Sequence, residues 1–125
     1  MAPEQLLEEL GLLREQGYEV ELIEADGFAN LVFRSYRLPA SLSRATTDLL
    51  VKIPLSYPNG RPDMFWTETD VLLKDGGVPR SAESIETILG RQWRRFSWHP
   101  QAWNPGFDST FTFLEFVNDR LRRAE

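Results

Sequence analysis

Residues 57–66 read Tyr-Pro-Asn-Gly-Arg-Pro-Asp-Met-Phe-Trp, and they directly follow an alternating apolar run at 49–55. The alternation predicts a β-strand, because successive side chains of a strand point to opposite faces of a sheet. Two prolines four residues apart cannot continue that strand, so a turn is expected after Tyr57. The bulky residues at 64–67 then predict a short return strand.

The segments around this unit predict two more strands and three helices. Strands are expected at 18–24 and 29–36, where apolar residues dominate. Leu6, Leu10 and Leu13 have helical spacing. Helices are therefore expected at 3–16, at 81–89 with Ser81 as cap and Gly90 as stop, and at 110–122 with Asp108 or Ser109 as cap. An N-terminal helix, a four-stranded antiparallel meander and C-terminal helices make an α+β fold, within a single domain of residues 1–125.

The composition excludes several classes of chemistry. The chain has 125 residues, of which 42% are hydrophobic, enough for a real core. It has no cysteine, which excludes disulfides, thiolate catalysis and cysteine-ligated zinc. A single His leaves too few ligands for a typical catalytic zinc site, so we expect neither a metal nor a cofactor. No apolar leader or membrane-length run is present in the sequence, so the expected location is the cytoplasm, without a membrane partner.

The charge distribution bears on partners. The formal net charge of −5 argues against a general nucleic-acid binder. Arginines are nevertheless concentrated at 91–95 and 120–123. A local basic patch could meet an acidic partner; the alternative is that these arginines are solvated on helix surfaces.

Residues 90–108 hold the best candidates for chemistry. This segment contains the only His, three of the four Trp and three Arg. Ser97 and His99 lie two residues apart, so an extended chain would point both to one side, where imidazole could activate the hydroxyl. Asp108 could orient the ring, and Arg95 could stabilise an oxyanion. The alternative is that Ser97 bonds locally to the backbone and His99 is a structural ring.

The same segment is a candidate for partner binding. Tryptophan and arginine are the residues most enriched at interface hot spots. The alternative for the tryptophans is that they anchor an irregular segment to the core. Arginine and aromatic residues also suit single-stranded nucleic acid, which the acidic remainder of the chain opposes. The candidate contact residues are Arg91, Trp93, Arg94, Arg95, Trp98 and Trp103.

Two of these stretches carry a family resemblance. The run at 52–66, with its Tyr-Pro turn and second proline, resembles the ubiquitin-conjugating-enzyme (UBC) superfamily. The run Gly-Arg-Gln-Trp-Arg-Arg-Phe-Ser-Trp-His at 90–99, followed by Trp103 and Gly-Phe-Asp at 106–108, resembles one bacterial branch, the prokaryotic family E. The resemblance covers about residues 18–121. It implies a UBC-like fold and a component of a bacterial ubiquitin-like modification pathway, of the kind found in antiviral defence operons.

The resemblance also implies partners and poses a chemical problem. The implied partners are a ubiquitin-like protein and its activating enzyme. Family enzymes carry the modifier as a thioester and pass it to an amine, but this chain has no cysteine. Either Ser97 carries the modifier as an oxyester with His99 as base, or the domain only binds and positions its partners. A third alternative is a structural or immunity-type α+β protein unrelated to conjugation.

Overall fold

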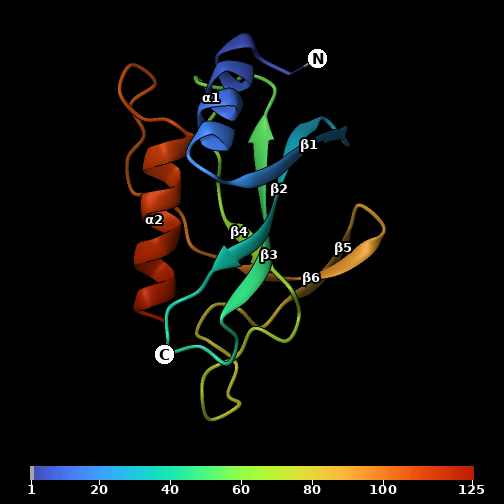
Figure 1. Ribbon diagram of the computed structural model, residues 1–125, viewed down its shortest axis with the longest axis vertical. Coiled ribbons are helices and arrows are strands. Elements are labelled where there is room, and N and C mark those ends of the chain that lie inside the picture. Colours follow the sequence, from blue (N-terminus) through green and yellow to red (C-terminus); the bar gives the residue numbers. More distant parts are fainter. Residues whose placement is uncertain (1) are drawn as a thin grey trace.

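Both helices lie on one face of a single antiparallel β-sheet (Figure 1). The computed structural model describes residues 2–125. The predicted α+β class, with a helix near each end of the described chain, is confirmed, but the sheet has six strands rather than four, in the order β1-β2-β3-β4-β6-β5. The elements are α1 (Glu4–Glu15), β1 (Glu19–Ala25), β2 (Phe28–Arg37), β3 (Thr46–Pro54), β4 (Phe65–Thr67), β5 (Ile85–Ile88), β6 (Arg91–Phe96) and α2 (Thr110–Arg122).

The first three strands form the predicted meander. Asp26 and Gly27 both have positive φ, of 54° and 82°, which is the geometry of the two-residue turn that suits a tight hairpin. Each strand then sends alternate side chains to opposite faces. On the face under the helices, Phe33 and Leu49 are at most 1% exposed and belong to the main core. On the other face a second, smaller cluster contains Val32, Leu50, Trp66 and Trp93.

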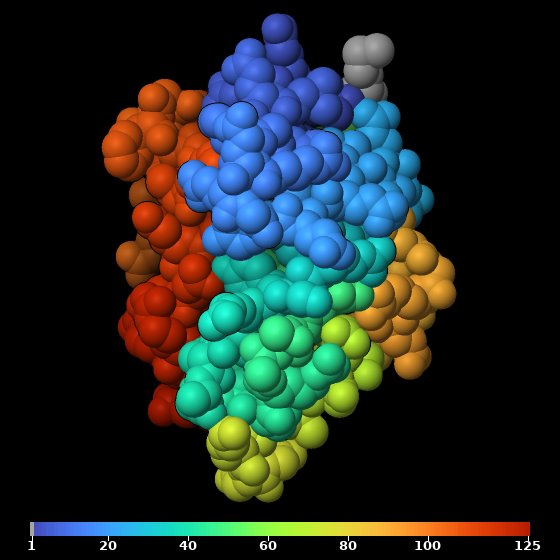
Figure 2. All heavy atoms as spheres, in the orientation of Figure 1, coloured from blue at the N-terminus to red at the C-terminus, as the bar shows by residue number. Residues whose placement is uncertain are grey.

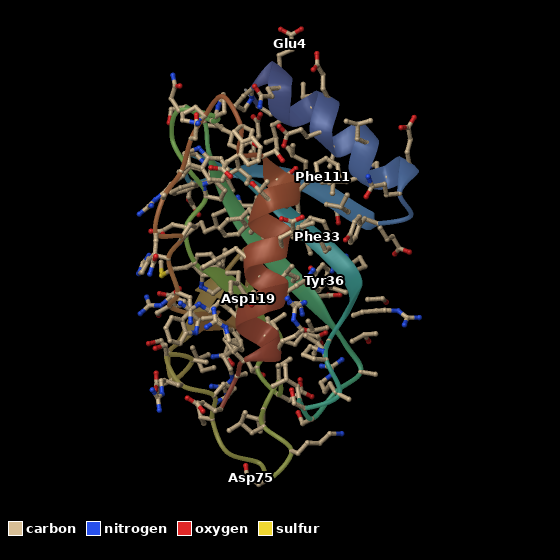
Figure 3. The ribbon with its side chains drawn as sticks, turned by 90° about the vertical axis from the view of Figure 1, so that its left-hand side faces the viewer. Glu4, Phe33, Tyr36, Asp75, Phe111 and Asp119 are labelled. Atoms are coloured by element: carbon tan, nitrogen blue, oxygen red, sulfur yellow. The ribbon has the colours of Figure 1, made fainter. Side chains whose placement is uncertain are left out.

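A bulge in β2 turns Tyr36 toward the helices. The pairing with β3 shifts between Phe33 and Tyr36, and Ser35 has a φ of 52°. Without the extra residue, Tyr36 would point to the opposite face from Phe33. Instead it lies beside α2, as Figure 3 shows, and its hydroxyl donates to Asn118 of that helix. Burial raises the pKa of Tyr36 above its ordinary value, so the phenol stays protonated and can donate.

The predicted helix at 81–89 is wrong: residues 85–88 form β5, which pairs with β6. Leu89 and Gly90 have φ of 55° and 76°, so they form the tight turn of a hairpin, and Gly90 is not a helix stop. Ser81 has a φ of 64°, outside the extended region that a helix cap adopts. The spacing of Ile85 and Ile88 matched a helix, but β-branched residues beside a turn favour a strand.

Helix α2 begins as predicted at a Ser109 cap. The Ser109 hydroxyl accepts from the backbone N–H groups of Phe111 and Thr112, and the Thr112 hydroxyl accepts from the Ser109 N–H. This reciprocal arrangement satisfies three N–H groups that the start of a helix leaves without partners.

A buried carboxylate joins α1 to the same end of α2. Glu9 is 7% exposed, and its Oε1 accepts hydrogen bonds from the Tyr57 hydroxyl (2.7 Å), the Thr110 N–H (2.8 Å) and the Thr110 hydroxyl (2.7 Å). The negative charge lies at the positive end of the α2 dipole. Burial raises the pKa of Tyr57, which keeps its proton for this bond. In Figure 2, the blue spheres of α1 touch the orange and red spheres of α2 and of the segment before it.

We therefore expect Glu9→Ala to lower the free energy of unfolding by about 2–4 kcal/mol, because three buried donors would lose their acceptor. Glu9→Gln keeps one acceptor oxygen and should lose less. Urea unfolding followed by tryptophan fluorescence measures both changes. The control is Glu8→Ala, an exposed neighbour on the same helix, which should shift stability by less than about 0.5 kcal/mol. Equal losses at Glu8 and Glu9 would contradict this account of the carboxylate.

Candidate functional site

The aromatic and basic segment at 90–108 consists of strand β6 followed by a loop. Strand β6 pairs with both β4 and β5, which fixes the direction of its side chains. Phe96 faces the helices and stacks on Phe65 of β4, with 5.0 Å between ring centroids. Trp93 faces the other way, in the smaller cluster. The candidate residues at 97–99 follow this strand immediately.

The Ser97 hydroxyl is held by an arginine. Its oxygen accepts a hydrogen bond from Arg95 Nε at 2.9 Å, and its backbone N–H donates to Ser81 O at 2.9 Å. Arg95 is fixed in turn by Glu86, with 2.8 Å between Nη1 and Oε2. Glu86 also accepts from the Trp66 indole at 2.7 Å. A guanidinium N–H on a hydroxyl oxygen stabilises negative charge there and leaves the hydroxyl proton free for a base.

His99 is paired with a carboxylate that the sequence did not single out. Its Nδ1 lies 2.5 Å from Asp63 Oδ1, and both side chains are about half exposed. A carboxylate on Nδ1 orients an imidazole and leaves Nε2 for a reacting group. Asp108, expected to take this part, instead accepts from the Asn104 N–H at 2.7 Å in a local turn. The sequence did not indicate Asp63 as the partner of His99, because the two residues are 36 positions apart.

Three contacts bind the Tyr-Pro turn to the loop after β6. Besides the Asp63–His99 pair, Arg61 Nη1 donates to Pro100 O at 2.8 Å, and the Trp103 indole donates to Pro58 O at 2.8 Å. The two stretches that carried the sequence argument therefore lie against each other. Within residues 2–125, no hydrogen bond joins the Ser97 hydroxyl to the His99 imidazole; each is held by a different partner.

A groove lies beside both networks. It has a volume of about 410 Å³, and its lining includes Asp63, the partner of His99, and Glu86, the partner of Arg95. Lys52 also lines the groove, and its ammonium lies 4.6 Å from the Phe28 ring centroid and 5.8 Å from that of Trp66. The groove thus has aromatic walls and side chains of both charges.

The six candidate contact residues have mixed surroundings. Trp93 is 1% exposed beneath Arg91, whose guanidinium lies 4.2 Å from the ring centroid. Arg94 is 9% exposed and donates to the backbone oxygens of Thr69 and Ala82. Trp98 lies under an arginine of α2, and Trp103 anchors the loop as described. Arg91 and Arg95 remain partly accessible. Phe107, which was not among the candidate contact residues, is 76% exposed in the same loop.

The arginine over Trp93 is tied to an acidic residue on the open face. Asp48 Oδ2 lies 2.9 Å from Arg91 Nη1 and 2.9 Å from Arg34 Nη1. Partial burial opposes ionisation of Asp48, but the hydrogen bonds from Arg91 and Arg34 outweigh it and hold the pKa below its ordinary value. The carboxylate therefore stays charged and keeps Arg91 on the indole.

Within the described part of the chain, His, Asp and Glu side chains form no group of three that could hold a metal ion. Neither α1 nor α2 has the length and apolar surface needed to cross a lipid bilayer, and residues 2–125 contain no other helix that does.

One family model matches the chain. The family model described as "Prokaryotic E2 family E" matches residues 7–124, nearly all of the chain. The protein therefore belongs to this prokaryotic E2-like family, as the sequence resemblance implied. Comparison with curated proteins and with solved structures gives no match.

The Asp48 pairs predict a pH dependence of stability. Because the folded-state pKa lies below the unfolded value of about 4, the stabilisation is complete above that pH and is lost as the pH falls through the folded-state pKa. Asp48→Asn should cost about 1 kcal/mol at neutral pH and flatten the acid limb of the stability profile. Urea unfolding across the acid range measures this. The control is Asp70→Asn, at a carboxylate that pairs with Arg44 and is 69% exposed. This change should leave the loss of stability at acid pH as steep as in the unchanged protein.

Proposed function

We propose that this member of prokaryotic E2 family E has a UBC-like fold and carries a ubiquitin-like protein as an ester on Ser97, in a cytoplasmic modification pathway. One observation carries the proposal: the Tyr-Pro turn supplies Asp63 to His99, two residues from a hydroxyl held by Arg95. The nucleophile paired with its arginine is therefore two residues along the chain from the base paired with its orienting carboxylate. Family membership supports the general pathway, and the absence of cysteine directs the chemistry to oxygen.

The proposed transfer is an acyl exchange. The Ser97 oxygen attacks the carbonyl carbon at the C-terminus of the ubiquitin-like protein, which the activating enzyme presents as a thioester. His99 Nε2 takes the hydroxyl proton, and Asp63 stabilises the imidazolium. The carbon–sulfur bond breaks, and the leaving thiolate receives the proton. Attack of an amine on the resulting ester forms the amide and returns the proton to Ser97.

This step requires the Ser97 hydroxyl and the His99 ring to form a hydrogen bond that the resting protein lacks. Ser97 and His99 have separate partners in the resting protein, and such bonds often form only once substrate is bound. His99 is 53% exposed and its loop lies outside regular structure, so the ring has room to turn. Arg95 can then stabilise the tetrahedral oxyanion or the serine oxygen. The groove beside Asp63 would hold the extended tail of the ubiquitin-like protein.

A second candidate is a binding module without covalent chemistry. The Ser97 oxygen is already engaged by Arg95, whose other bonds to Glu86 are structural. Under this alternative, the groove binds the ubiquitin-like tail or the activating enzyme and only positions it. The two candidates differ in a single observable, the covalent adduct.

The test mixes the purified protein with its activating enzyme, ATP and the ubiquitin-like partner. We expect an adduct that resists thiols and is cleaved by hydroxylamine or base. Ser97→Ala should abolish it. His99→Gln should slow its formation by about 10²–10⁴-fold, since general-base catalysis contributes that much, and Asp63→Asn should slow it to a smaller extent.

The matched control is Ser41→Ala, at an exposed serine in the loop between β2 and β3, which should leave the adduct unchanged. An adduct that survives Ser97→Ala would rule out this serine. Stoichiometric binding without any covalent species would favour the binding module instead.

A further inference from the structure

A second cavity lies on the helix side of the chain at 96–98. Its volume is about 430 Å³, and Phe96 and Trp98 form part of its wall. These two residues alternate along the chain with Ser97 and His99, which do not line it. Its other walls come from the loop before β5, through Arg80, and from the last turns of α2. It is therefore separate from the groove at Asp63.

The lining of this cavity is strongly cationic. Three arginines line it, Arg80, Arg120 and Arg123, against one acidic side chain, that of Glu125. Arg123 is paired with Asp119, which is labelled on α2 in Figure 3 and lies outside the cavity lining. Arg120 has no ion pair in the described part of the chain, so its charge is available to a ligand.

The position of Arg120 is not explained by helix electrostatics alone. Cations in the last turns of a helix are favoured by the helix dipole, which accounts for Arg120 and its neighbours being arginine. The dipole does not account for the stacking of Arg120 on Trp98, a residue from a different segment, with 4.0 Å from guanidinium carbon to ring centroid. Stacking on an indole fixes the plane of the guanidinium and leaves its N–H edge for an oxyanion.

An acidic residue of the chain, Glu125, already contacts one of these arginines. Glu125 Oε1 lies 3.5 Å from Arg80 Nη2, and the Arg80 N–H donates to the Glu125 backbone oxygen at 2.9 Å. An acidic residue is thus held by both its side chain and its backbone, as a bound peptide would be. The ion pair is loose, since a close pair has an N–O distance of about 2.7–2.9 Å, and both side chains are mostly exposed. A competing carboxylate can therefore displace it.

We propose that the cavity bounded by Arg80, Arg120 and Arg123 binds a carboxylate-rich peptide segment of a partner protein. A partner Asp or Glu pairs with the stacked Arg120, and the partner's backbone takes the place of Glu125 at the Arg80 N–H. The aromatic walls receive the aliphatic stems of the acidic side chains. The basic cluster at the end of the sequence thus serves recognition, independently of any acyl transfer at Ser97.

The test measures binding of a short, acetylated and amidated glutamate-rich peptide by fluorescence anisotropy at low ionic strength. We expect binding that weakens as salt is added, and none for the matched glutamine peptide. Arg120→Gln should weaken binding about tenfold or more, the effect of losing one charge-assisted contact. Glu125→Gln should strengthen it severalfold by removing the internal competitor, a gain that misfolding cannot produce.

The matched control is Arg122→Gln, which removes the same charge from the same helical turn but at a side chain outside the cavity lining. It should change the affinity by less than about twofold, because only screened, long-range attraction is lost. An equal loss at Arg122 and Arg120 would overturn the proposal in favour of unspecific charge attraction. Binding of inorganic phosphate at this cavity without binding of the glutamate peptide would overturn it as well.

Discussion

The carboxylate of Glu9 is the constraint on which the arrangement of the protein depends. It is buried, and it can remain so because one oxygen accepts three hydrogen bonds, from Tyr57 and from both donors of Thr110. Those partners belong to the Tyr-Pro turn and to the first residue of α2. A charge removed from water needs this number of partners. These hydrogen bonds join the first helix, the Tyr-Pro turn and the start of the last helix at one point.

The candidate site inherits its geometry from that point. Tyr57 is anchored by Glu9, and the residues after it supply Pro58, Arg61 and Asp63 to the loop that follows β6. The loop has little regular structure of its own, so these side-chain bonds hold it in place. Reactive groups on a loop tied to a rigid scaffold can be ordered and yet adjust to a substrate. This suits a serine and a histidine that have separate partners at rest.

The stretch at 91–99 also divides the surface into two electrostatic regions. On the open face, Arg34, Arg91 and Arg95 all have carboxylate partners, which are Glu21, Asp48, Glu68 and Glu86. On the helix side, Arg120 is stacked on Trp98 without a counterion within residues 2–125. Arginines that look alike in the sequence therefore differ in what they can still bind. The arginines in ion pairs stabilise the fold, whereas Arg120 can still pair with an acidic group of a partner.

The sequence by itself determined what local periodicity and residue chemistry control. The alternation at 49–55, the leucine spacing of α1 and the Ser109 cap predicted three elements correctly, and the absence of cysteine closed the thioester route. The hairpin at 85–96 was missed because two isoleucines three residues apart fit a helix as well as a strand, and only the pairing of β5 with β6 decides between them. Tertiary structure alone placed Asp63 against His99 and gave Glu9 its hydrogen-bond partners. It also placed Arg120 on Trp98, without an ion-pair partner among residues 2–125. Each of these contacts joins groups that are distant along the chain. Packing of the whole sheet brings such groups together, and no local sequence pattern encodes it.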